Sequence, residues 1–305
     1  MLYKYFSSEV LELVFHRDGF CGVKCSFPKD YNDPYELFLG VDLSVPPHHL
    51  ATYRDVVQDL PQYPTTCFSK SPIVTPMWAH YGNDHSGFVL EFDAKAMGEH
   101  FEKIAIHDVN YRDDPDPSIV PLLERAAEIA KARYVYMLRN AVLLNAYFSK
   151  HTSWTYEQEC RLVDQNNFCE DAAGNRVLFI PIECVTSIIV GHKTPVPVIE
   201  ASRQIAEDNN LDWYHAVIGK SHGLPFLRDA SGQSFVFDAY SIKIAANTCD
   251  NCSEPVAEGR EFCPWCSITE EDDINAASRN PYRLLDHLGM LEDYVNDADK
   301  IGGGV

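Results

Sequence analysis

Four cysteines near the C-terminus constrain the fold more than any other feature of the sequence. Cys249 and Cys252 form one C-x2-C pair, Cys263 and Cys266 form another, and ten residues separate the two pairs. Each pair can direct two thiolates at one ion, and two pairs complete the tetrahedral coordination that zinc prefers. Four soft thiolates favour zinc, with iron as the alternative. The sequence therefore predicts a structural zinc site in a small ribbon.

The other six cysteines indicate a reducing compartment. They are scattered through apolar sequence and are expected to be buried thiols rather than a disulfide framework: Cys21, Cys25, Cys67, Cys160, Cys169 and Cys184. The N-terminal residues include charged and polar side chains where a secretory signal needs an apolar run. No apolar stretch approaches the length of a membrane span. We therefore expect a cytoplasmic protein with no membrane association.

The charge balance excludes one class of function. The chain has 25 Lys and Arg residues against 45 Asp and Glu residues, a formal net charge of −20. A chain of this charge repels phosphate overall, so it does not hold nucleic acid by general electrostatic attraction. Such acidity fits a soluble protein or one with a basic partner.

Strand-like and helix-like segments follow one another without regular alternation, which predicts an α+β fold with a mixed or antiparallel sheet and flanking helices. We expect strands at 2–6, 21–28, 65–70, 87–93, 154–163, 177–182, 185–191 and 213–218. A long helix is expected from Ser118 to about Phe148, and another at 199–209. An amphipathic helix is expected from Pro281 to Tyr294, with four leucines on one stripe.

The segment Trp154–Val163 contains the most suggestive charged residues. On a strand, Glu157, Glu159 and Arg161 would share one face. One interpretation is an ordinary strand with its charges in water. The other is a pair of carboxylates lining a cleft, with Arg161 paired to one of them or binding a phosphate.

Two further segments have both a structural and a functional interpretation. Trp78, His80, Tyr81 and His85 precede a strand and suit stacking on a flat ring such as nicotinamide. Equally, Trp78 can be a core residue, with the histidines at a loop edge. Asn32–Glu36 has the composition of a turn before the next element.

Taken in order, these segments resemble a widespread prokaryotic domain family of unknown function. The resemblance extends over about residues 1–227 and rests on six motifs: Leu2–Tyr5, Asn32–Glu36, Cys67–Ser69, Met77–Asp93, Trp154–Arg161 and Val185–Gly191. We expect this domain at 1–227, the zinc ribbon at 228–270 and an acidic helical tail at 271–305. The ribbon and tail lie outside the resemblance.

More distantly, the layout resembles the ADP-ribosyltransferase fold, including toxins that modify DNA. That resemblance implies a split sheet and NAD as co-substrate. It implies Glu159 as the catalytic carboxylate and Glu157 as the carboxylate facing the acceptor. It makes Lys4 or Tyr5 the first polar position, where those enzymes have His or Arg. The residues expected around NAD are Lys4, Tyr5, Trp78, His80, Tyr81 and Arg161.

Three functions remain open from the sequence. The first is an NAD-dependent transferase, such as a toxin or phage-defence effector, that modifies nucleic acid or protein. The second is a non-catalytic module that docks a partner through the zinc ribbon and the tail. The third is a phosphoester-cleaving nucleic-acid enzyme that holds a divalent ion at four side chains: Glu36, His80, Glu157 and Glu159.

Overall fold

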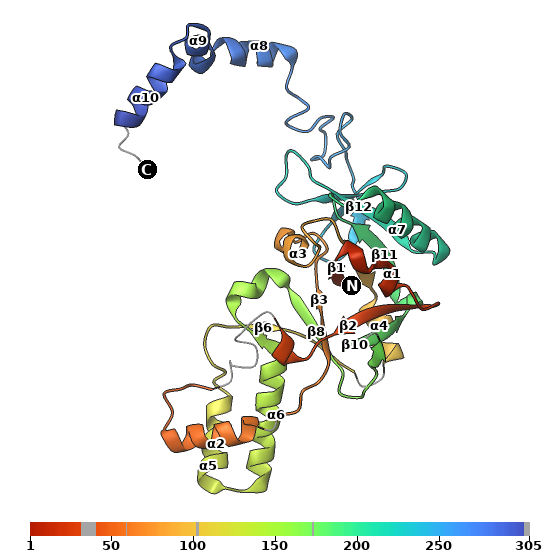
Figure 1. The fold of residues 1–305 in the computed structure, drawn as a ribbon, viewed down its shortest axis with the longest axis vertical. Coiled ribbons are helices and arrows are strands. Elements are labelled where there is room, and N and C mark those ends of the chain that lie inside the picture. Colours follow the sequence, from red (N-terminus) through yellow and green to blue (C-terminus); the bar gives the residue numbers. More distant parts are fainter. Residues whose placement is uncertain (32–40, 59, 102–103, 173, 302–305) are drawn as a thin grey trace. The chain divides into compact units, whose positions relative to one another are not determined.

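The computed structural model describes residues 1–31, 41–58, 60–101, 104–172 and 174–301, so Asn32–Glu36 and the expected ligand Glu36 lie outside the described residues. The chain divides into two compact units. The first comprises residues 1–218 and 224–244, and the second comprises 219–223 and 245–305. Strands and helices are mixed in the first unit, as expected for an α+β fold (Figure 1). Among the described residues, no helix combines the length and the apolar character needed to cross a membrane.

A ten-stranded sheet forms the framework of the first unit within the described residues. Its strands pair in the order β15-β14-β13-β12-β11-β4-β1-β3-β8-β5. Neighbouring strands are antiparallel except for β11 and β12, which are parallel. The bounds are β1 Leu2–Phe6, β3 Thr65–Ser69, β4 Phe88–Phe92, β5 Ala105–Asp108, β8 Glu159–Val163, β11 Val185–Val190, β12 Asp212–Val217, β13 Phe226–Asp229, β14 Ser234–Phe237 and β15 Ile242–Ile244.

The centre of this sheet explains its continuous apolar sequence. All five residues of β4 are buried because both faces of the strand are covered. Glu91 is the one charged residue in β4, and it accepts a hydrogen bond from the Tyr3 hydroxyl at 2.8 Å. The hydroxyls of Thr186 and Ser187 also donate to Glu91. The buried carboxylate is therefore satisfied and has a structural role.

The sheet splits between β1 and β3. β1 pairs with β4 along its whole length, whereas its described pairing with β3 is the single pair Tyr3 and Ser69. A second sheet, β2-β10-β9, lies beside the split, and its bounds are β2 Phe20–Cys25, β9 Glu170–Ala172 and β10 Asn175–Pro181. Ser26, after β2, forms a two-bond bridge with Thr65 at the start of β3. An edge of β3 is therefore left open between its contacts with β1 and β2.

Helices lie beside both sheets and in a separate helical layer. The bounds are α1 Leu11–Val14, α2 Pro47–Gln58, α3 Thr75–His80, α4 Ala94–His100, α5 Ile119–Ile129, α6 Ala132–Phe148 and α7 Val196–Asp208, with short 3-10 helices at Ser8–Val10, Pro28–Asp30, Thr152–Glu157 and Ile182–Cys184. α2, α5 and α6 enclose their own apolar cluster, which includes Val56, Leu123 and Leu138 (Figure 1). The single long helix expected from Ser118 to Phe148 is wrong, because Ala130 has a left-handed φ of 50° that ends α5.

Two short strands, β6 and β7, determine the position of Lys150. β6, Asn110–Tyr111, pairs in parallel with β7, Ser149–Lys150, directly after α6. The pairing fixes Lys150 where the chain turns toward β8.

The second unit contains the cysteine segment and three helices. The helices are α8 Glu270–Ser278, α9 Pro281–His287 and α10 Leu291–Ile301. The helix expected over 281–294 is interrupted, because Gly289 has a φ of 67° that ends α9 before α10 begins.

The first unit extends further along the chain than the expected 1–227. β13, β14 and β15 continue the large sheet from β12, so residues to Ile244 belong with it rather than with the ribbon expected at 228–270. The aromatic side chains of these strands explain this, since Phe235 and Phe237 pack on the cluster that contains Tyr3 and Tyr214.

Candidate functional sites

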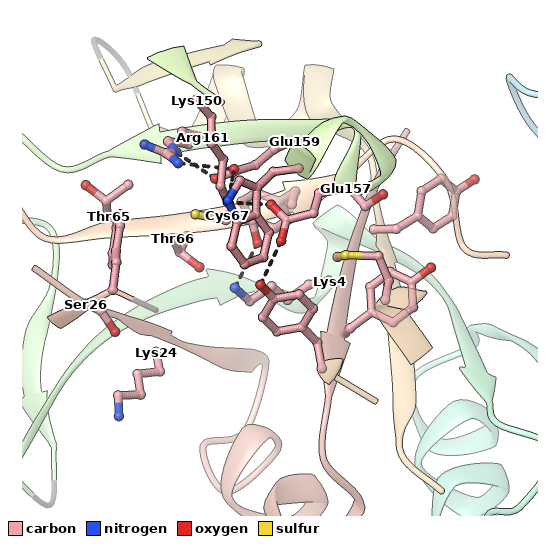
Figure 2. A pocket seen from close by; sticks show the side chains of 18 of the residues that line it. Lys4, Lys24, Ser26, Thr65, Thr66, Cys67, Lys150, Glu157, Glu159 and Arg161 are labelled. Atoms are coloured by element: carbon pink, nitrogen blue, oxygen red, sulfur yellow. Dashed lines mark hydrogen bonds and ion pairs between the residues drawn. The ribbon is translucent and has the colours of Figure 1, made fainter. Parts of the chain in front are cut away.

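A pocket with a volume of about 240 Å³ opens where the sheet splits (Figure 2). Strands β1, β3 and β8 contribute to it side by side, and the end of β2 lies across from them. Its lining combines aromatic, cationic and acidic side chains: Tyr3, Lys4, Tyr5, Lys24, Ser26, Asp30, Tyr31, Thr65, Thr66, Cys67, Phe68, Ser69, Met77, Tyr81, Lys150, Trp154, Glu157, Glu159 and Arg161.

Glu159 lies at the centre of a buried charge network. Its two oxygens accept hydrogen bonds from Arg161, Nε at 2.6 Å and Nη2 at 3.1 Å, and Lys150 Nζ donates to it at 3.1 Å. The backbone N–H of Glu159 donates to the Tyr111 hydroxyl at 2.8 Å. The guanidinium of Arg161 has a further contact that fixes its position, since its Nη1 donates to the Tyr147 carbonyl at 2.9 Å. This bidentate pairing fixes the carboxylate in one orientation.

Glu157 reaches the same network from a different element. It ends the 3-10 helix Thr152–Glu157, and Gln158, with a φ of 47°, turns the chain into β8. The expectation that Glu157, Glu159 and Arg161 share one face of a single strand is therefore wrong for Glu157. Its carboxylate still meets Lys150 Nζ, and the Tyr81 hydroxyl donates to its Oε1 at 2.7 Å.

The two carboxylates differ in acidity. Burial is the largest influence on each and acts to raise both pKa values. For Glu159, the charges of Arg161 and Lys150 outweigh burial and lower the pKa below its usual range. For Glu157, Lys150 only partly offsets burial, and the nearby charge of Glu159 adds to it, so the pKa is raised. Two neighbouring carboxylates whose pKa values are shifted in opposite directions are typical of acid and base chemistry.

The pocket also contains cationic side chains outside this network and offers hydroxyl groups. Lys4 Nζ donates to the Cys67 carbonyl at 2.8 Å, across the split between β1 and β3. Lys24 and Ser26 line the pocket from the end of β2 (Figure 2). Thr66 is 2% exposed, and its hydroxyl oxygen is buried with no hydrogen-bond partner among the residues that the structure describes. Such an unsatisfied group is costly unless a ligand or water completes it.

Most residues expected around NAD line this pocket, but two do not. Lys4, Tyr5, Tyr81 and Arg161 belong to the lining. Trp78 is 1% exposed and packs in the core.

Trp78 and His80 have other positions in the fold. The Trp78 indole donates to the Pro72 carbonyl at 2.8 Å and packs edge-on against Tyr5. Met77 lines the pocket in the same turn of α3, while His80 is exposed to solvent. The helical phase of α3 therefore turns both expected residues away from the pocket.

Lys150 and Trp154 were missed. Lys150 Nζ lies 4.6 Å from the centre of the Trp154 ring, a cation–π contact beside both carboxylates. Trp154 opens the motif Trp154–Arg161, but its aromatic ring gave no indication of a role beside the carboxylates. A single lysine after a helix is normally solvated, so the signal for Lys150 was its position seven residues before Glu157.

The second unit contains the expected cysteine cluster. The sulfur atoms of Cys249, Cys252, Cys263 and Cys266 all lie within 4.8 Å of one another, close enough to bind a metal ion. Thiolates at about 2.3 Å from a tetrahedral zinc ion lie roughly 3.8 Å apart, and Cys252 Sγ and Cys263 Sγ are 3.8 Å apart. Although burial acts to raise it, backbone N–H groups of the two turns lower the pKa of Cys249 to about 6. This favours the thiolate of Cys249 that a metal needs, whereas burial raises the pKa of Cys252 and a hydrogen bond with Cys263 raises the pKa of Cys266 to about 12.

Comparison with known proteins supports part of the expected resemblance. Residues 77–162 match the model of a family described as "Protein of unknown function (DUF2971)". The matched stretch includes Tyr81, Lys150, Glu157, Glu159 and Arg161, and so contains the charge network. No curated protein and no solved structure matches the chain. The similarity to ADP-ribosyltransferases stays a prediction.

Proposed function

We propose that the pocket at the split of the sheet is the active site of an NAD-consuming transferase of the ADP-ribosyltransferase type. The observation that carries the proposal is the buried pair of carboxylates with opposite pKa shifts, joined by Lys150 at one end of an aromatic pocket. The acceptor is a nucleic acid or a protein.

The fixed negative charge suits the bond that such enzymes break. Loss of nicotinamide from the ribose develops positive charge on the sugar, and a carboxylate beside it stabilises that charge in a site with little water. Glu159 is 4% exposed and remains ionised because of Arg161. Glu159 is therefore the residue that would stabilise the positive charge on the sugar.

Glu157 has the properties of a proton acceptor. Its raised pKa makes Glu157 a stronger base than an ordinary carboxylate, which suits a general base. Tyr81 orients it through the 2.7 Å hydrogen bond. Glu157 would take the proton of the incoming nucleophile while Glu159 stabilises the sugar.

The rest of the pocket fits the remaining parts of NAD. Tyr81 and Trp154 offer ring faces for nicotinamide, and Trp154 replaces Trp78 in that expected role. Lys4 and Lys24 provide cations for the diphosphate, and the Thr66 hydroxyl, which has no partner within the described part of the chain, provides a donor.

A metal-dependent phosphoester enzyme is less well supported. The ammonium of Lys150 is hydrogen-bonded to both carboxylates and takes the place between them that a divalent cation would need. Within the described residues, neither Glu157 nor Glu159 belongs to a group of three convergent metal ligands, and His80 lies outside the pocket.

For the cysteine cluster, we infer bound zinc with a structural role. All four coordination positions are filled by protein thiolates, which leaves none for a substrate. The cluster is thus expected to stabilise its segment rather than to take part in the reaction.

The decisive experiment measures release of nicotinamide from NAD by purified protein and by the Glu159→Gln variant. Removing the fixed charge should lower the rate by about 10²–10³-fold. Glu99→Gln, an exposed change on α4, is the matched control and should leave the rate unchanged. A Glu159→Gln protein that melts as a folded protein and still releases nicotinamide at the wild-type rate would overturn the proposal.

A further inference from the structure

A second group of metal-ligand side chains lies in the helical layer, away from the pocket. His48 and His49 occupy the first turn of α2, and Glu128 lies in the last turn of α5. The two helices pack side by side in the first unit (Figure 1). Nearly eighty residues of sequence separate the histidines from the glutamate, so the fold itself brings the three together.

The three side chains converge on one point. His48 Nε2 and His49 Nε2 each lie 2.9 Å from the same oxygen of Glu128. Each of the three residues offers one ligand atom, and these three atoms all lie within 4.8 Å of one another. An ordinary ion pair needs one imidazole per carboxylate oxygen, whereas this arrangement directs two imidazole nitrogens at one.

Burial differs among the three in a way that suits a metal site. The His49 side chain is 8% exposed, so packing fixes its ring, whereas His48 and Glu128 are 65% and 61% exposed. Ligands around a tetrahedral zinc ion at 2.0–2.1 Å lie about 3.4 Å apart. The observed 2.9 Å separations are slightly shorter. The two exposed side chains can rotate to admit an ion while His49 stays in place.

The helix ends do not oppose a cation overall. The C-terminal end of a helix carries partial negative charge and the N-terminal end partial positive charge. Glu128 is near the C-terminal end of α5 and His48 near the N-terminal end of α2, so the two contributions offset. The carboxylate charge then favours the ion.

We propose that His48, His49 and Glu128 form a second metal site that binds a divalent ion of the zinc type. Two imidazoles and one carboxylate are a ligand set that zinc accepts with water in the open position. The ion joins the first turn of α2 to the last turn of α5 and stabilises the helical layer. It is independent of the transferase proposal and of the cysteine cluster.

The test titrates Zn²⁺ into full-length protein at neutral pH and measures the bound ions per chain. We expect two zinc ions in the wild type and one in Glu128→Gln and His48→Ala, with affinity for the second ion reduced by roughly tenfold or more. Both changes are at exposed side chains, so the core is left intact. Glu124→Gln, also exposed and one turn earlier on α5, is the matched control and should keep both ions.

Cobalt substitution distinguishes the two sites. Cobalt at the cysteine cluster gives thiolate charge-transfer absorption, whereas a second equivalent at nitrogen and oxygen ligands adds weak visible bands without it. Loss of only those weak bands in Glu128→Gln supports the proposal. The proposal fails if the wild type binds a single ion, or if Glu128→Gln and His48→Ala bind the second ion as tightly as the wild type.

Discussion

The pocket network and the cysteine cluster bring ionisable groups together by different routes. The four thiols come from one short stretch, where two tight turns define the ligand positions. The pocket network brings together Lys150 after α6, Glu157 at the end of a 3-10 helix, and Glu159 and Arg161 on β8. Local spacing therefore specifies the first site, while tertiary packing specifies the second. The two sites should respond differently to loss of one member.

The largest expected effect is at the cysteine cluster. Cys266→Ser removes one thiolate, and binding of structural zinc contributes about 10 kcal/mol or more to such a segment. We expect loss of one bound metal ion and rapid amide exchange throughout residues 249–266, with exchange in the large sheet unchanged. Mass spectrometry of hydrogen exchange measures both regions in one experiment.

Cys266→His is the matched variant for that prediction, because a set of three cysteines and one histidine also binds zinc. It should recover the metal and the slow exchange. If Cys266→Ser keeps its metal, the cluster is not held by four thiolates and the contrast with the pocket disappears.

Next in size is the loss of the guanidinium in the pocket. Arg161→Met leaves Glu159 buried without its main partner, and an uncompensated buried charge costs about 3–5 kcal/mol. Chemical denaturation should show this decrease in the free energy of unfolding. Lys193→Met removes an exposed ion pair with Asp84 and should change stability by about 0–1 kcal/mol. Equal effects of the two changes would mean that the network adds nothing beyond a surface pair.

A smaller effect is expected in the pH dependence of stability. The pKa of Glu159 is lower in the folded protein than in the unfolded chain, where it is about 4.3. Its stabilising contribution is therefore fully present above about pH 5 and is lost as the pH falls through the folded value. The difference in unfolding free energy between the wild type and Glu159→Gln should shrink as the pH is lowered from 5 to 3. A difference that is constant over this range would contradict the lowered pKa.

The sequence predicts the features that depend on local spacing. The cysteine cluster follows from two short C-x2-C pairs, and the α+β class follows from the irregular order of strand-like and helix-like segments. Lys4, Tyr81 and Arg161, which the resemblance to ADP-ribosyltransferases places around NAD, line the pocket. Central strands such as β4 are recognisable because burial on both faces requires apolar residues throughout.

Features that depend on backbone conformation or on distant partners were not predictable. Ala130 and Gln158 have left-handed φ angles that their residue types do not indicate, so a helix was expected to continue and a strand to begin too early. Met77 and Tyr81 are four positions apart and line the pocket, while Trp78, one position after Met77, packs in the core, so the phase of α3 decides which residues face the pocket. Lys150 becomes part of the site because β7 pairs with β6.

The smallest expected effect concerns the leucines after the cysteine cluster. Leu284 and Leu288 are 61% and 58% exposed, so they contribute little to the stability of the isolated chain. Leu288→Ser should change the free energy of unfolding by less than about 0.5 kcal/mol, and should leave nicotinamide release unchanged. Thermal melting together with light scattering measures stability and association. If Leu288→Ser instead lowers the melting temperature or dissociates an oligomer, the stripe is covered by a partner, and the docking function expected for this tail gains its first direct support.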